Sequence, residues 1–183
     1  TKAAILYDQK QAYSKGLRDD FTKAFTAMGG TIVVDQAYSG GDTDYSAQLN
    51  SIKAKGPEIV FVPGYYTDGA NIAIQARKAG LTVPLIGGDG WDSEQLGKIA
   101  GDAIVGSYFS NHSAPDQPSM QTFISKYKAE HSNQIPDALA GLGYDAANLL
   151  FDALKRAKSN SGKDLRDAIA ATQGFKGVTG AIS

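Results

Sequence analysis

Three absences narrow the function of this chain: it has no cysteine, no excess of basic residues and no long apolar run. Because none of the 183 residues is cysteine, disulfide frameworks and thiolate chemistry are excluded. Lysine and arginine total 18 against 19 aspartates and glutamates, so a net charge of -1 gives no basic surface for nucleic acid. No stretch approaches the roughly 20 apolar residues that a membrane-spanning helix needs. The remaining composition, 42% hydrophobic and 20% charged, is that of an ordinary globular protein.

Motifs for catalysis and for metal binding are missing as well. His112 and His131 are the only histidines, and neither has the spacing of a metal ligand. The chain has no Walker A loop and no G-x-S-x-G elbow. GLGYDA at 141–146 has the spacing of a dinucleotide fingerprint, but it follows IPDALA and not a strand, so the required context is absent. We therefore expect no metal, no cofactor and no enzyme activity, and favour a binding function.

Residues 1–110 alternate between short apolar segments and helical patterns. The expected strands are Lys2–Tyr7, Thr31–Val34, Glu58–Val62, Val83–Ile86 and Ala103–Phe109. Apolar residues at helical spacing mark two expected helices, Leu17 to Met28 and Tyr45 to Ile52, the second capped by Asp42 or Thr43. A third helix is expected from a cap at Thr67 to Ala79, and a fourth from a cap at Asp92 or Ser93 to Ile99. This alternation predicts an α/β fold, a parallel sheet with helices on both faces.

The remaining residues follow a different pattern. Residues 111–119, NHSAPDQPS, are polar and contain two prolines, which is typical of a crossing segment. Residues 120–173 carry three helical patterns with no strand between them, the third capped at Ser161, and Gly177–Ile182 is an expected final strand. The middle helix has an apolar stripe from Leu139 to Ala157. We expect these helices to cover a second sheet that this sequence does not contain.

The residues that follow the expected strands are candidates for a ligand site, because ligands bind beyond the carboxyl ends of strands in open parallel sheets. Tyr13 follows the first strand, Tyr65 the third, and Asp89, within GGDGWD, the fourth. A carboxylate can receive an ammonium group, aromatic rings can pack on a carbon skeleton, and the glycines would let a ligand approach the backbone. This edge therefore predicts a site for a small cationic or zwitterionic ligand. A capping role for Asp89 and a surface position for Tyr13 are the alternatives.

Three further aromatic residues are weaker candidates. Tyr66 and Trp91 lie in the same loops, but local packing is the stronger interpretation of each from the pattern alone. Tyr144 falls nearly opposite the apolar stripe of its helix, at about 100° per residue. It is therefore expected to face solvent, a partner or a cleft, with packing against a neighbouring helix as the alternative.

Five segments, in order along the whole chain, resemble the substrate-binding proteins of branched-chain amino-acid ABC transporters. These are the leucine/isoleucine/valine-binding proteins, which have periplasmic binding fold type I. The segments are AAILYDQKQAYSKGL, EIVFVPGYYTDGANIAIQARKAGL, PLIGGDGWDSEQL, DALAGLGYDAANLLFDAL and GFKGVTGAIS. The resemblance implies that residues 1–110 form lobe two, 111–119 a hinge crossing, 120–173 helices of lobe one, and 174–183 the crossing back. It also implies a fragment that lacks the first half of lobe one.

The same resemblance implies a function and its partners. Asp89 matches the acidic residue that meets the ammonium group of the ligand, and Tyr13, Tyr65 and Tyr144 match aromatic contacts. The implied protein captures an amino acid between two lobes and presents it to the membrane subunits of an ABC importer. We expect a monomer in the periplasm or on the outer cell surface. The alternative is a ligand-sensing domain of a regulator or receptor on the same fold, responding to an amide or an amino acid.

Overall fold

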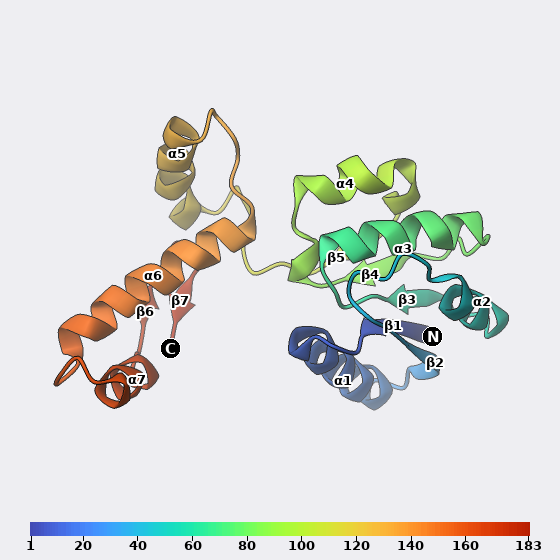
Figure 1. Ribbon diagram of the computed structural model, residues 1–183, viewed down its shortest axis with the longest axis horizontal. Helices are drawn as coiled ribbons and strands as arrows, with labels where there is room; N and C mark the ends of the chain where they lie inside the picture. The colour runs from blue at the N-terminus through green and yellow to red at the C-terminus, as the bar shows by residue number, and fades with distance from the viewer. The chain divides into compact units, whose positions relative to one another are not determined.

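A five-stranded parallel sheet forms the centre of Thr1–Ser110, the first of two units in the computed structural model, which describes residues 1–183. The strands lie in the order β2-β1-β3-β4-β5, and every neighbouring pair is parallel (Figure 1). Their bounds are β1 Lys2–Asp8, β2 Thr31–Tyr38, β3 Ile59–Phe61, β4 Leu85–Gly87 and β5 Tyr108–Phe109. The α/β fold class predicted from the sequence is confirmed.

Helices connect successive strands and cover both faces of this sheet. Their bounds are α1 Ala12–Ala27, α2 Ser46–Ala54, α3 Tyr66–Lys78 and α4 Glu94–Ala100, with short 3-10 helices at η1 Asp89–Trp91 and η2 Gly101–Ile104. Figure 1 shows α1 on one face and α3 and α4 on the other. Right-handed crossovers require this arrangement, because the chain leaves β1 toward β2 at one edge and then returns past β1 to β3.

The main apolar core lies between the sheet and the helices that follow β2, β3 and β4. Its fully buried side chains include Leu49 and Ile52 of α2, Ile72 of α3, Leu85 of β4 and Trp91 of η1. Burying one such side chain stabilises the fold by roughly 1.5–3 kcal/mol. This packed layer holds the loops at the carboxyl ends of the strands in fixed positions.

The second unit, Asn111–Ser183, consists of helices and a two-stranded antiparallel sheet. Its elements are η3 Pro118–Met120, α5 Gln121–Glu130, α6 Ala138–Arg156, α7 Gly162–Ala170, β6 Phe175–Lys176 and β7 Ala181–Ile182. Asp145, buried in α6, accepts hydrogen bonds from the backbone amides of Val178 and Thr179, both at 2.8 Å. The turn between β6 and β7 is thereby fixed to α6.

One face of α6 carries large apolar side chains that remain exposed. Leu139, Leu150, Phe151 and Leu154 are between 38% and 58% exposed. The buried positions of the helix are Ala138, Gly141, Asp145 and Ala153. The apolar stripe predicted from the sequence therefore lies mostly outside the core of this unit.

Helix starts differ from the predictions at two of four places. Ser93 and Ser161 cap α4 and α7 as predicted, each accepting a backbone N–H bond at 3.2 Å. The cap predictions at Asp42 or Thr43 and at Thr67 are wrong, because the residues that precede α2 and α3 are Tyr45 and Tyr65. At α2 the reason is tertiary. The Tyr45 side chain is fully buried and its amide donates to the Gln75 side chain at 2.8 Å, which together fix the start of the helix.

Two expected strands are also corrected by the backbone. The strand predicted at Ala103–Phe109 shrinks to β5, because residues 101–104 form η2 and Gly106, with φ +79°, lies outside the extended β conformation. The strand predicted at Gly177–Ile182 is instead a turn followed by β7. Gly177 N donates to the Gly180 carbonyl at 2.9 Å, and Gly180 has φ +143°.

Candidate functional site

Three loops meet at the carboxyl edge of the sheet, beside the point where the strand order reverses between β1 and β3. Ser14, in the first turn of α1, connects the loop after β1 with the loop after β3. Its hydroxyl donates to the Pro63 carbonyl after β3 and accepts the Asp8 amide at the end of β1 at 2.9 Å. Ser14 is fully buried, so this connection is shielded from water. It holds the start of α1 against the loop that carries Tyr65.

Tyr13 and Asp89 are joined by a direct hydrogen bond across 76 positions of sequence. The Tyr13 hydroxyl donates to Asp89 Oδ1 at 2.7 Å and accepts from the backbone N–H of Gly90 at 3.0 Å. Tyr13 comes from the first turn of α1, and Asp89 is the first residue of η1. The two residues predicted from the strand ends therefore lie together, on different loops.

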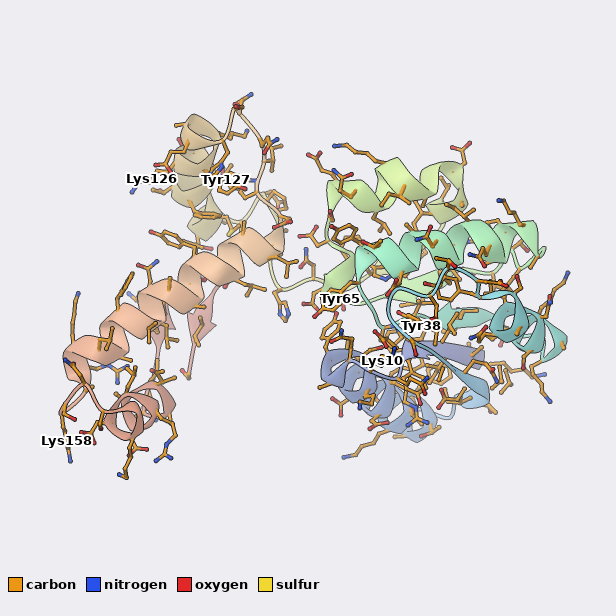
Figure 2. The ribbon with its side chains drawn as sticks, in the orientation of Figure 1. Lys10, Tyr38, Tyr65, Lys126, Tyr127 and Lys158 are labelled. Carbon is orange, nitrogen blue, oxygen red and sulfur yellow. The ribbon has the colours of Figure 1, made fainter.

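Tyr65 completes this group. Its ring stacks on the Tyr13 ring with centroids 5.3 Å apart and an interplanar angle of 24°. The side chain is 43% exposed, and Figure 2 shows it beside α1 at the end of the first unit. Two aromatic faces and one carboxylate thus form a partly open surface, which can pack an apolar chain and receive a positive charge.

The glycines around Asp89 serve close packing within the protein. A Cβ at Gly88 would lie 2.8 Å from the Tyr13 hydroxyl oxygen, and one at Gly90 would lie 2.7 Å from the Gly64 carbonyl oxygen. A Cβ at Gly87 would collide with the Trp91 ring. The missing side chains let η1 approach α1 and the loop after β3. The approach of a ligand to the backbone of these glycines stays a prediction.

Trp91 and Tyr66, the weaker candidates of the same loops, occupy packing positions. The Trp91 side chain is 1% exposed and fills the space above Gly69 and Gly87. Tyr66, at the start of α3, is partly buried against the main core. These positions indicate that both side chains stabilise the loops by packing. A direct contact with the ligand stays a prediction for each.

Burial and the hydrogen bond to Asp89 both raise the pKa of Tyr13 well above its ordinary value, because each penalises the phenolate. The Tyr13 hydroxyl therefore remains a protonated donor at neutral pH. No group of three or more His, Cys, Asp or Glu side chains is arranged to hold a metal ion. No helix has the length and apolar character required to span a bilayer.

Tyr144 belongs to α6 in the second unit. It is 45% exposed, and its ring lies 5.0 Å from that of Phe123 in α5, tilted by 43°. The two alternatives given by the sequence pattern, exposure and packing against a neighbouring helix, thus both describe part of its surroundings. Its role as a ligand contact stays a prediction.

Sequence reasoning missed a second polar cluster at the same edge of the first unit. The Tyr45 hydroxyl donates to Asp68 Oδ1 at 3.3 Å, and the Gly41 amide donates to the same oxygen at 3.4 Å. The Tyr38 hydroxyl, labelled in Figure 2, is buried with no hydrogen-bond partner. Burial raises the pKa of Asp68, and the nearby charge of Asp8 adds to this shift. No motif marks the cluster, because its members come from three separate stretches: the end of β1, residues 38–45 and the first turn of α3.

Comparison with known proteins places the whole chain in one family. The model of the family described as periplasmic binding protein matches residues 1–183. A Leu/Ile/Val-binding protein homologue of Brucella melitensis is 32% identical over 160 residues, covering 86% of this chain and 42% of that protein. The Leu/Ile/Val-binding protein BraC3 of Rhizobium johnstonii is 31% identical over 183 residues, covering 99% of this chain and 48% of that protein.

Solved structures similar to this chain include proteins of the same kind as these relatives. A leucine-binding protein of Thermotoga maritima is 35% identical with a TM-score of 0.89, covering 100% of this chain and 52% of that one. A branched-chain amino acid transporter substrate-binding protein of Streptococcus pneumoniae, solved with isoleucine, is 32% identical with a TM-score of 0.83 and the same coverage. The chain spans about half the length of the relatives it matches. It therefore belongs to the periplasmic binding protein family, among the homologues of the Leu/Ile/Val-binding proteins.

Proposed function

We propose that the protein is the solute-binding component of an ABC importer and captures an amino acid of the leucine, isoleucine or valine type. The observation that carries this proposal is the Asp89 carboxylate, held by Tyr13 beside the exposed ring of Tyr65 at the carboxyl edge of the sheet. A carboxylate beside a pair of stacked aromatic rings suits a ligand that has an ammonium group next to an apolar side chain.

The binding step involves no covalent chemistry. The ligand ammonium forms a charge-assisted hydrogen bond with Asp89, typically about 1.5–3 kcal/mol, and the rings of Tyr13 and Tyr65 pack on the ligand's carbon atoms. The known relatives are about twice as long as this chain, so the rest of the protein supplies the groups that hold the ligand carboxylate. Tyr144 is the candidate contact from the second unit.

The role in transport is part of the proposal. Ligand-driven closure of two lobes would present the loaded protein to the membrane subunits of the importer, in the periplasm or on the outer cell surface. This support comes from the family and from the names of the relatives. A sensor domain on the same fold would bind ligand in the same way, and only uptake measurements in cells lacking the protein separate the two roles.

A thermal-shift titration tests the binding function directly. In the full-length protein that contains this chain, leucine, isoleucine or valine should raise the melting temperature in a concentration-dependent manner, because a ligand that binds only the folded state stabilises it. Asp89→Ala should strongly reduce the shift at the same ligand concentrations. A shift that is unchanged in Asp89→Ala, or that none of twenty amino acids produces in the wild type, would refute the proposed function.

A further inference from the structure

The Tyr13 hydroxyl both donates to and accepts from other groups of the protein. A phenol has one proton to donate, and Tyr13 donates it to Asp89 Oδ1 at 2.7 Å. The Tyr13 hydroxyl oxygen also accepts a hydrogen bond from the Gly90 N–H at 3.0 Å. Tyr13 can therefore not donate to a ligand while it holds Asp89. Its hydroxyl links the carboxylate to the backbone of the next residue and so fixes the direction in which Asp89 points.

The ring that carries this hydroxyl is itself fixed by the protein. Tyr65 stacks on one of its faces, and the close approach of Gly88 leaves no space for a side chain beside the hydroxyl oxygen. The next residue, Ser14, anchors the first turn of α1 to the Pro63 carbonyl. All of these contacts are made by the protein's own side chains and backbone, which together set the orientation of Tyr13.

We propose, on the basis of the proposed function, that Tyr13 is a positioning residue, whose hydroxyl holds the Asp89 carboxylate in the orientation that receives the ligand's ammonium group. A carboxylate held in one rotamer loses no conformational freedom on binding, whereas an unrestrained one must be ordered by the ligand at a cost in affinity. The raised pKa of Tyr13 supports this role, because the hydroxyl keeps its proton throughout the neutral pH range.

The first variant is Tyr13→Phe in the full-length protein, with L-leucine as the probe in calorimetric titration. It removes the hydroxyl and keeps the ring that stacks on Tyr65. We expect the dissociation constant to rise about tenfold. The melting temperature of the ligand-free protein should fall by a few degrees, because the Gly90 N–H loses its acceptor. The matched control is Tyr108→Phe, which removes an exposed hydroxyl on β5 and should change the dissociation constant by less than about twofold.

A double-mutant cycle separates positioning from direct contact. In an Asp89→Ala background there is no carboxylate to orient, so Tyr13→Phe should weaken leucine binding no further. If the Tyr13 hydroxyl instead contacts the ligand itself, the two losses should multiply, and the positioning role is wrong. Wild-type protein that binds no amino acid would refute the proposed function. Wild-type protein that binds leucine, together with an equally tight Tyr13→Phe variant, would refute only the positioning role.

Amide hydrogen exchange provides a measurement that needs no variant. The Gly90 N–H donates to Tyr13, so the proposal predicts slow exchange of this amide in the ligand-free wild-type protein. Leucine should add little further protection at this amide. Exchange of Gly90 at the rate of an unstructured amide, slowed only when leucine is added, would show that the arrangement forms with the ligand and would overturn the proposal.

Discussion

Thr179 is joined to Asp145 by two hydrogen bonds, one from its amide at 2.8 Å and one from its hydroxyl at 2.6 Å. Together with the Val178 amide, they surround the carboxylate, which is only 2% exposed. This arrangement fixes the segment before β7 to the middle of α6, and it replaces water with three protein donors around a buried charge.

Removing this carboxylate should destabilise the second unit. Asp145→Ala leaves two partly buried backbone donors without partners, and we expect a loss of about 2–3 kcal/mol in the free energy of unfolding. Urea denaturation, followed by a probe in the second unit, would measure it. The matched control is Asp152→Ala on the same helix, whose exposed ion pair with Arg156 should contribute about 0.3–0.5 kcal/mol. Equal effects of the two substitutions would contradict the anchoring role of Asp145.

Asp68 should make stability fall as pH rises. Burial raises its pKa above the ordinary value of 3.8, so the folded protein binds this proton more tightly than the unfolded chain. The stabilisation is complete below pH 3.8 and is lost as pH increases through the raised pKa. Asp68→Asn keeps an acceptor for Tyr45 and Gly41, so at pH 7 it should increase the free energy of unfolding, with the gain disappearing at low pH.

Asp44 gives a control of opposite sign for that pH titration. Its pKa is lowered by hydrogen bonds from Ser46, so its contribution is present above the ordinary value and is lost as pH falls. Asp44→Asn should therefore leave the protein equally stable or less stable at pH 7. Denaturation curves of both variants between pH 3 and pH 8 would check this contrast. A loss of stability at pH 7 in Asp68→Asn would show that the carboxylate is better stabilised than its burial implies.

Gly90 and Gly97 should respond in opposite ways to alanine. A Cβ at Gly90 would lie 2.7 Å from the Gly64 carbonyl oxygen, so Gly90→Ala should shift η1, cost roughly 1–3 kcal/mol and weaken leucine binding. Gly97 lies within α4 with no atom near its Cβ position, so Gly97→Ala should stabilise the protein by up to about 1 kcal/mol. Melting temperatures of both variants would test the pair, and a Gly90→Ala variant as stable as the wild type would contradict the tight packing of η1.

Trp91 should affect stability more than affinity. Its ring is buried in the main core, and Trp91→Ala should cost about 3–5 kcal/mol. The milder Trp91→Phe keeps an aromatic ring at that position, so it should lower the melting temperature while changing the leucine dissociation constant by less than about threefold. A large loss of affinity with an unchanged melting temperature would instead support a ligand contact for Trp91.

Much of the candidate site was predictable because parallel strands bring their carboxyl ends to one edge of the sheet. That rule placed Tyr13, Tyr65 and Asp89 among the residues that follow three separate strands, and the structure brings these three together. The hydrogen bond between Tyr13 and Asp89 was not predictable, since it depends on the rotation of one ring and on the close approach of Gly88 and Gly90. Spacing along the chain contains no information about either.

Local rules failed where tertiary contacts decided the geometry. Ser93 and Ser161 cap their helices through their own side chains, and both were predicted. The start of α2 depends on the buried ring of Tyr45 and on Gln75 from α3, which no local pattern shows. The two polar groups that connect the site, Ser14 and the Pro63 carbonyl, were missed because a serine inside a helical pattern has no distinguishing signal.

The exposed apolar face of α6 has a practical consequence for experiments. Large apolar side chains are exposed to water when residues 1–183 are produced alone, namely Leu139, Leu150, Phe151 and Leu154. Such a preparation should self-associate as its concentration rises, which light scattering would detect. A titration with a weakly binding ligand would then measure self-association as well as ligand binding. Affinities are therefore best determined on the longer polypeptide, and the 183-residue segment is better suited to dilute spectroscopic work.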